Sequence, residues 1–146
     1  MTAAAAAASL PAPAPVVNPE TEAFWDATAR GELLLPRCRA CGYTIWYPRA
    51  LCPSCGSTDV EWLPASGRGR VYSFTVIRRG EGAYREAAPY VLAYVELEEG
   101  PRMLTNLVEV EAVRVGLPVE VVFHDTGAGN ALPRFRPSAH TEVMDG

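Results

Sequence analysis

Residues 38–56 read CRACGYTIWYPRALCPSCG, and this stretch decides how the N-terminal half of the chain folds. It holds two Cys-x-x-Cys-Gly motifs, separated so that ten residues (42–51) lie between the two cysteine pairs. Two residues between paired cysteines let one tight turn direct both sulfurs at a single ion, and two such turns form a tetrahedral four-sulfur site. The glycine after each pair can adopt the positive φ that turns backbone amides toward the sulfurs. The pattern predicts a rubredoxin-like zinc ribbon over residues 34–63, with one structural zinc held by Cys38, Cys41, Cys52 and Cys55.

Other roles for the four cysteines fit the sequence less well. Two disulfides would need an oxidising compartment, but no basic region of a secretory signal precedes Arg30, the first Lys or Arg of the chain. A catalytic zinc keeps an open position and usually has a histidine or carboxylate among its ligands. Both histidines, His124 and His140, lie far down the chain. We therefore expect a closed structural site in a cytoplasmic protein. The arginines near the cysteines either offset the charge of the sulfurs or form ordinary solvated surface.

The N-terminal segment changes character at Asn18. Residues 1–17 consist largely of alanine and proline, which predicts a disordered or loosely attached tail. Residues 18–33 are expected to hold an N-terminal helix, with Asn18 as its N-cap and Gly31 placed to end it.

Phe24 and Trp25 are adjacent on that expected helix and point about 100° apart. We expect one ring to anchor the helix on its own domain while the other stays exposed and docks a partner subunit. Burial of both rings in the core of the chain is the alternative, and the sequence does not separate the two.

Composition excludes several classes of protein. The chain of 146 residues has a formal net charge of -4, which argues against a dedicated nucleic-acid binder, because neutralising phosphates needs a basic face. No apolar run approaches the roughly 18 residues that a membrane-spanning helix requires, so we expect a soluble protein that does not enter the membrane. With 49% hydrophobic residues the chain can build a core.

The C-terminal half follows a strand pattern. We predict five short strands, over residues 71–77, 90–97, 102–110, 119–123 and 132–137. The interruption between the third and the fourth matches an OB-type barrel, and a small open β-sandwich is the second interpretation. The predicted fold is mainly β: a helix, a four-cysteine zinc ribbon, a five-stranded OB-fold over residues 64–138, and a tail over residues 139–146.

Motifs along residues 18–138 resemble those of a known family, domain-of-unknown-function family 35. The paired cysteines alone would be weak, but their order with the motifs of the C-terminal half is specific. The further motifs are Phe24-Trp25, Tyr47-Pro48-Arg49, Gly67-Arg68-Gly69 before the first strand, Ala88-Pro89-Tyr90-Val91 and Leu132-Pro133-x-Phe135-Arg136-Pro137.

The resemblance implies a function that spacing alone does not. Proteins of this family are similar to accessory subunits, without catalytic residues of their own, that assemble with thiolase-like enzymes or with hydratases acting on acyl-CoA in lipid and steroid side-chain degradation. By that resemblance, this chain would bind acyl-CoA and join a thiolase or lipid-transfer-type aldolase subunit, two copies of each forming a heterotetramer. It would show no turnover alone, yet be a required component of an acyl-CoA lyase or thiolase complex.

Binding of CoA by an acidic chain requires a local basic patch for its phosphates. The candidates for that role are Arg78, Arg79, Tyr84 and Arg134, and the loop 79–89 with its two glycines is a candidate lip of the site. Ordinary solvated surface is the alternative for the arginines.

Two other functions stay open at this point. OB barrels and zinc ribbons also bind single-stranded nucleic acid, and Trp46, Tyr72 and Phe74 could stack on bases, although the net charge weighs against it. A self-sufficient enzyme is the third possibility, but no nucleophile–base pair is visible in the sequence.

Overall fold

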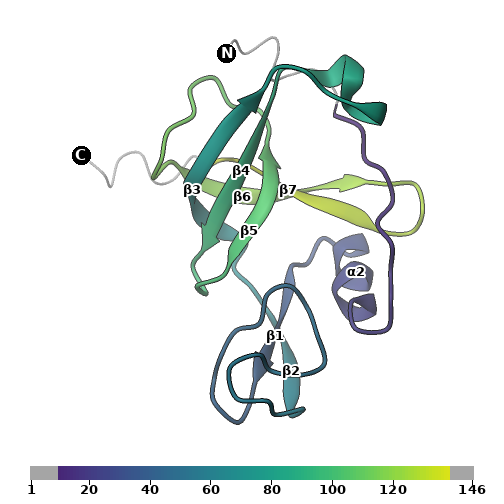
Figure 1. Ribbon diagram of the computed structural model, residues 1–146, viewed down its shortest axis with the longest axis vertical. Helices are drawn as coiled ribbons and strands as arrows, with labels where there is room; N and C mark the ends of the chain where they lie inside the picture. Colours follow the sequence, from purple (N-terminus) through teal and green to yellow (C-terminus); the bar gives the residue numbers. More distant parts are fainter. Residues whose placement is uncertain (1–9, 139–146) are drawn as a thin grey trace.

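The computed structural model describes residues 10–138 as a closed β-barrel above a short helix and a small two-stranded sheet (Figure 1). In chain order the elements are α2 (Glu22–Ala29), β1 (Leu34–Cys38), β2 (Val60–Pro64), β3 (Arg68–Ile77), η1 (Gly82–Ala87), β4 (Tyr90–Leu97), β5 (Arg102–Leu107), β6 (Pro118–Asp125) and β7 (Ala131–Pro137). The predicted mainly-β fold is confirmed. The expected C-terminal tail, and the first nine residues of the N-terminal one, lie outside the described residues. Neither described helix has the length and apolar character needed to cross a bilayer.

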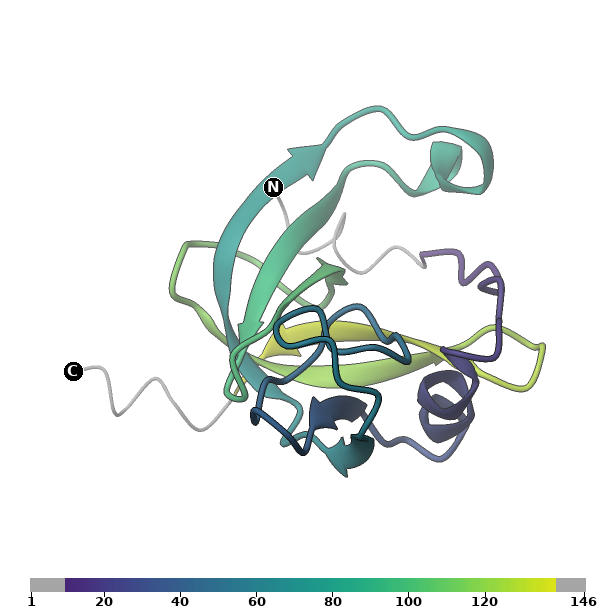
Figure 2. The ribbon, with the colours of Figure 1, turned by 60° about the horizontal axis from the view of Figure 1, so that its bottom comes forward.

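The barrel strands follow the order β3-β4-β5-β7-β6, and pairing of β3 with β6 closes the ring. All neighbours are antiparallel except β5 and β7, which run parallel with Leu107 opposite Phe135. In Figure 2, β3 and β4 arch above the yellow-green β6 and β7. This closed five-stranded ring is an OB-type barrel and excludes the open sandwich. The third strand ends at Leu107, three residues earlier than predicted, while the other strands begin and end within a few residues of their predicted limits.

Alternation along the strands builds the core. On β4, Val91, Ala93 and Val95 point inward and are buried, as the two-residue period of a strand requires. The same apolar cluster continues beyond the barrel to Phe24 of α2 and Leu35 of β1. Helix, ribbon and barrel therefore share one core.

The helix begins later than the sequence indicated. Asn18 was expected to be its N-cap, but the regular helix begins at Glu22 with Thr21 in the capping position. Asn18 instead caps the preceding turn, because its Oδ1 accepts a hydrogen bond from the Thr21 amide at 3.2 Å. The predicted end is confirmed: Gly31 has φ 74°, and its amide donates to the Thr28 carbonyl at 3.0 Å.

Thr28 fastens the helix to the barrel. Its buried hydroxyl accepts a hydrogen bond from the amide of Ala131 on β7 at 3.0 Å and donates one to the carbonyl of Trp25 at 2.6 Å. Because both groups would be costly to bury unpaired, this bridge fixes where α2 sits against β7.

Gly69 gives the first testable prediction. A Cβ atom at this position would lie 2.5 Å from the carbonyl oxygen of Glu96 and 2.8 Å from a methyl group of Val95 on the neighbouring strand. Because β4 cannot retreat without disturbing its ladder, we expect Gly69→Ala to lower the free energy of unfolding by about 3 kcal/mol. Arg68→Ala, which removes an adjacent side chain that is 58% exposed, should cost about 1 kcal/mol or less. Urea unfolding measures both, and equal losses would contradict the close approach.

Candidate functional site

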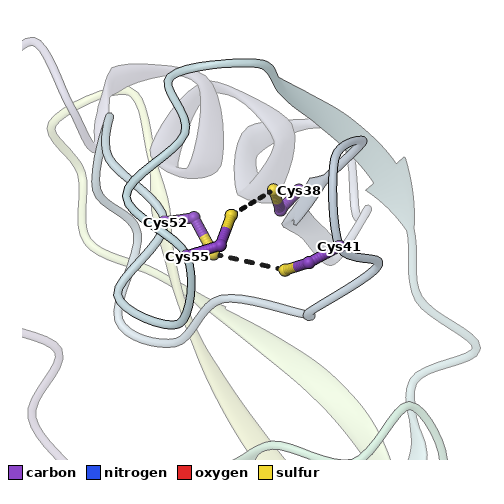
Figure 3. Close-up of side chains that lie close together, drawn as sticks. All are labelled: Cys38, Cys41, Cys52 and Cys55. Carbon is purple, nitrogen blue, oxygen red and sulfur yellow. Dashed lines mark hydrogen bonds between the residues drawn. The ribbon is translucent and has the colours of Figure 1, made fainter.

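The four cysteines are positioned by two matching turns (Figure 3). In the first turn the amide of Gly42 donates to the carbonyl of Cys38 at 2.8 Å, and in the second the amide of Gly56 donates to the carbonyl of Cys52 at 2.8 Å. Both glycines have φ 81°, a conformation that other residues rarely adopt. The two halves of the cluster are thus built in the same way, as the repeated Cys-x-x-Cys-Gly motif predicts.

The sulfur positions fit one metal ion. All four Sγ atoms lie within 4.8 Å of one another. The Sγ atoms of Cys38 and Cys55 are 3.6 Å apart, and those of Cys41 and Cys52 are 3.7 Å apart (Figure 3). Tetrahedral coordination with metal–sulfur bonds of about 2.3 Å places neighbouring sulfurs about 3.8 Å apart, whereas a disulfide needs about 2.05 Å. The four predicted ligands therefore come together as a four-cysteine metal site.

The neighbouring sulfurs act on the pKa values of two of the thiols, Cys38 and Cys55. A hydrogen bond from the Cys41 amide outweighs desolvation and lowers the pKa of the Cys38 thiol to about 7. At Cys55 a hydrogen bond from the Ser57 amide acts in the same direction, but the neighbouring sulfurs and desolvation outweigh it and raise the pKa to about 12. One thiolate forms readily and makes the next one costly. A positive ion among the sulfurs would therefore favour deprotonation of Cys55.

A second site is an aromatic cleft of about 330 Å³ where helix, ribbon and barrel meet. A mostly apolar cleft with a few convergent polar groups is the usual form of a small-molecule site. Its lining comprises Phe24 and Trp25 of α2, Trp46 and Tyr47 of the ribbon, Tyr84 of η1, residues 103–106 of β5 and residues 132–134 of β7.

The aromatic rings behind this cleft pack edge to face. The Phe24 ring lies 4.9 Å from that of Trp25 and 5.4 Å from that of Trp46, and the Trp25 indole N–H donates to the Tyr47 hydroxyl at 3.2 Å. Phe24 and Trp25 are only 1% and 8% exposed. The expectation that one of them stays exposed on the isolated chain is therefore wrong, because the ribbon loop covers both.

Arg134 of β7 is the one charged residue in the lining. It is 2% exposed, and its guanidinium donates to the Tyr84 hydroxyl at 3.1 Å, the Pro11 carbonyl at 2.6 Å and the His124 Nδ1 at 2.9 Å. Because an arginine can only donate, His124 accepts through an unprotonated Nδ1. Burial lowers the pKa values of both Arg134 and His124.

The structure separates the four CoA candidates into two groups. Tyr84 and Arg134 meet in the aromatic cleft, whereas the exposed Arg78 and Arg79 line another, open cleft of about 490 Å³ together with Arg85. The helix η1 contributes Tyr84 to the first cleft and Arg85 to the second.

An exposed apolar face covers the outside of β3, β4 and β5, and it was not predicted as a unit from the sequence. We call it the barrel face; its members are Tyr72, Tyr94 and Leu104, exposed by 46, 45 and 53%. Phe74 is 37% exposed but pairs with the inward-facing Ala93, so it lies on the other side of the sheet. Apolar residues at outward positions of alternating strands were the available signal. Leu104 also lines the aromatic cleft, so the face and the cleft adjoin. Of the three base-stacking candidates, Tyr72 lies on this face, Phe74 on the inner side of the sheet, and Trp46 in the lining of the aromatic cleft.

Two domain models match the chain. "ChsH2, rubredoxin-like zinc ribbon domain" matches residues 25–61, and "ChsH2, C-terminal OB-fold domain" matches residues 62–124. The boundary between the two matched ranges falls within β2.

Curated proteins with similar sequences include three of interest. A "probable enoyl-CoA hydratase alpha subunit" of Thermomonospora curvata is 36% identical over 132 residues, which cover 89% of this chain but only 41% of the relative. A "DUF35 domain-containing scaffold protein" of Pyrococcus furiosus is 40% identical, covering 69% of this chain and 80% of that protein. "Benzoylsuccinyl-CoA thiolase subunit BbsA" of Geobacter metallireducens is 38% identical, covering 58% and 57%.

Among solved structures, a chain of an "Ltp2-ChsH2(DUF35) aldolase" superposes with a TM-score of 0.77 at 36% identity. The alignment covers 85% of this chain and 98% of that chain. The likeness therefore extends over ribbon and barrel together.

The metal site yields the second prediction. Cys41→Ser removes one of four ligands, so we expect bound metal to fall from about one ion per chain to a small fraction of that, with a lower melting temperature, because metal binding and ribbon folding are coupled. Ser54→Ala changes an exposed residue inside the second turn that supplies no ligand and should leave both unchanged. Elemental analysis of the purified chains decides. Equal metal content in the two variants would disprove the ligand set.

A third prediction concerns pH. Desolvation and the Arg134 guanidinium hold the pKa of His124 below its ordinary 6.5, although Glu109 opposes them. The unfolded state therefore binds the proton more readily, so the stability contributed by neutral His124 is complete above the unfolded pKa and is lost as the pH falls below it. His124→Gln keeps an acceptor for Arg134 that does not titrate. Melting temperatures at about pH 7.5 and 5.5 should fall less for this variant than for wild type, with His140→Gln controlling for loss of an imidazole. An equal fall would contradict the assignment.

Proposed function

This chain belongs to the DUF35 family, and from that premise we propose that it is a non-catalytic scaffold subunit of a thiolase-like enzyme that acts on acyl-CoA. The ChsH2-type members of the family combine a rubredoxin-like zinc ribbon with an OB-fold. The observation that carries the proposal is the alignment over 98% of a chain in an Ltp2-ChsH2(DUF35) aldolase. Two of the relatives support the same assignment, because one is named a scaffold protein and the other a thiolase subunit. We propose a heterotetramer with an aldolase or thiolase subunit in lipid or steroid side-chain degradation.

The metal in this proposal is one structural zinc. Four thiolates complete a tetrahedral shell and leave no position for a water or substrate, and soft sulfur ligands in tetrahedral arrangement suit Zn²⁺. Within the described residues the aromatic cleft offers hydroxyl, amide and guanidinium groups but neither a carboxylate nor an imidazole. That set can bind and orient a thioester, and it supports leaving the nucleophile and the base to the partner.

The ligand in this proposal spans the helix η1. The aromatic cleft would take the apolar acyl and pantetheine part, with Tyr84 and Arg134 as hydrogen-bond donors. The phosphates would reach the open cleft on the other side, where Arg78 and Arg79 offer paired donors for phosphate oxygens. The contribution of η1 to both clefts supports one extended ligand rather than two.

The barrel face is the proposed partner surface. It exposes two tyrosines, a residue type enriched at interfaces, and it adjoins the aromatic cleft at Leu104. A partner covering it would therefore stand beside the bound thioester. The role in docking that we predicted for Phe24 and Trp25 then becomes indirect: they position Tyr47, which is 41% exposed at the mouth of the cleft.

Two tyrosines of equal exposure test this docking surface. Tyr94 on the barrel face and Tyr43 on the ribbon are each 45% exposed. We expect Tyr94→Ala to weaken binding of the co-expressed thiolase-like subunit at least about 30-fold, corresponding to about 2 kcal/mol at an interface hot spot. Tyr43→Ala should change it less than about threefold. Titration calorimetry with metal content as a control gives both values.

The assignment of scaffold rather than enzyme has its own test. The partner's acyl-CoA reaction should require this chain, and the chain alone should show no turnover. Steady turnover by the purified chain without the partner would refute the proposal, as would an unaltered partner activity when the chain is omitted.

A further inference from the structure

Arg134 is buried without a counter-charge. Its three hydrogen-bond acceptors, on Tyr84, His124 and Pro11, are all uncharged, and no carboxylate forms an ion pair with it within residues 10–138. Its neighbour Arg136, by contrast, pairs with Glu120 at 2.9 Å. A buried guanidinium gains most from a charged or strongly polarised oxygen. Arg134 could therefore donate to a charged or strongly polarised oxygen of a ligand.

The Pro11 carbonyl comes from a segment with few other attachments. Residues 10–17, which we call the strap, run from beside η1 past the tip of β6 and β7 down to α2 (Figure 1 and Figure 2). The strap has no regular secondary structure, and within the described part of the chain its hydrogen bonds are limited to the one between Pro11 and Arg134. Its three prolines have no amide hydrogen to donate and stiffen it in an extended form. Pro11, Ala12 and Pro15 are half-buried. The expected loose tail thus includes a segment seated on the barrel.

We propose that the strap is a removable cover of the aromatic cleft. The Pro11 carbonyl occupies the Arg134 donor that an oxygen of the bound acyl-CoA takes, so ligand and strap compete for one guanidinium. The identity of the ligand rests on the proposed function, whereas the cover itself rests on the contact between Pro11 and Arg134. Within the described residues the strap has this one hydrogen bond, which the Pro11 carbonyl accepts, so a ligand that accepts from Arg134 and also buries apolar surface in the cleft can displace it.

Competition of this kind lowers the apparent affinity for ligand by the fraction of molecules in which the strap is displaced. Removal of the strap should therefore tighten binding without any new contact. Two N-terminal deletions that differ only by residues 10–12 isolate the contribution of Pro11. Removing residues 1–9 leaves Pro11 in place, and removing residues 1–12 deletes it.

Titration calorimetry with dodecanoyl-CoA on the metal-loaded chains provides the test. We expect the chain lacking residues 1–12 to bind at least about fivefold more tightly than the chain lacking residues 1–9, and the latter to match the full chain. Equal affinities of the two deletions would overturn the cover and leave the proposed function standing. Absence of dodecanoyl-CoA binding by all three chains would refute the acyl-CoA ligand of the proposed function, and with it the competition.

A second measurement uses the full chain and needs no deletion to fold. Amide ¹⁵N relaxation of Ala12 and Ala14 reports the order of the strap directly. Dodecanoyl-CoA should lower their order parameters below about 0.6, the range of a released segment. Ordered amides in the saturated complex would overturn displacement even where the deletions bind more tightly.

Discussion

Edge-to-face packing of Phe24 against Trp46 is the contact on which the rest of the structure depends. A helix of eight residues, a two-stranded ribbon and a five-stranded barrel are each too small to bury much apolar surface alone. The Phe24 ring lies in the apolar cluster that reaches from α2 into the barrel, while Trp46 packs on it from the ribbon. Because this junction also forms one wall of the cleft, the contact that unites the fold also shapes the cleft.

The metal site acts on that junction from a distance. The ten residues between the two cysteine pairs include Trp46 and Tyr47, so coordination holds both ends of the loop that carries them. Closing the loop with a metal ion lowers its conformational entropy before the Trp46 and Tyr47 rings pack, so their packing costs less entropy. A four-sulfur metal site can therefore shape the cleft without touching it.

Local patterns were predictable, and long-range ones were not. The cysteine turns and the strands depend on residues near each other in the sequence, and they lie where spacing and alternation placed them. The burial of Trp25 depends on Tyr47, 22 residues away, and no local pattern announces that contact. Arg78 and Arg134 are the same residue type, but Arg78 is exposed and Arg134 is buried. The register of β7 turns the Arg134 side chain toward η1. Asn18 caps a turn instead of the helix, since two turns in succession need separate caps.

Two of the three tryptophans, Trp25 and Trp46, line the aromatic cleft, and the third, Trp62, lies on β2. Indole emission depends on the polarity around the ring, so two of the three indoles of this chain report on the walls of a single cavity. The Trp25 indole N–H is held by a tyrosine hydroxyl, which adds a polar contact to which emission responds. The wavelength of the intrinsic tryptophan emission of this protein therefore depends on the hydration of the cleft.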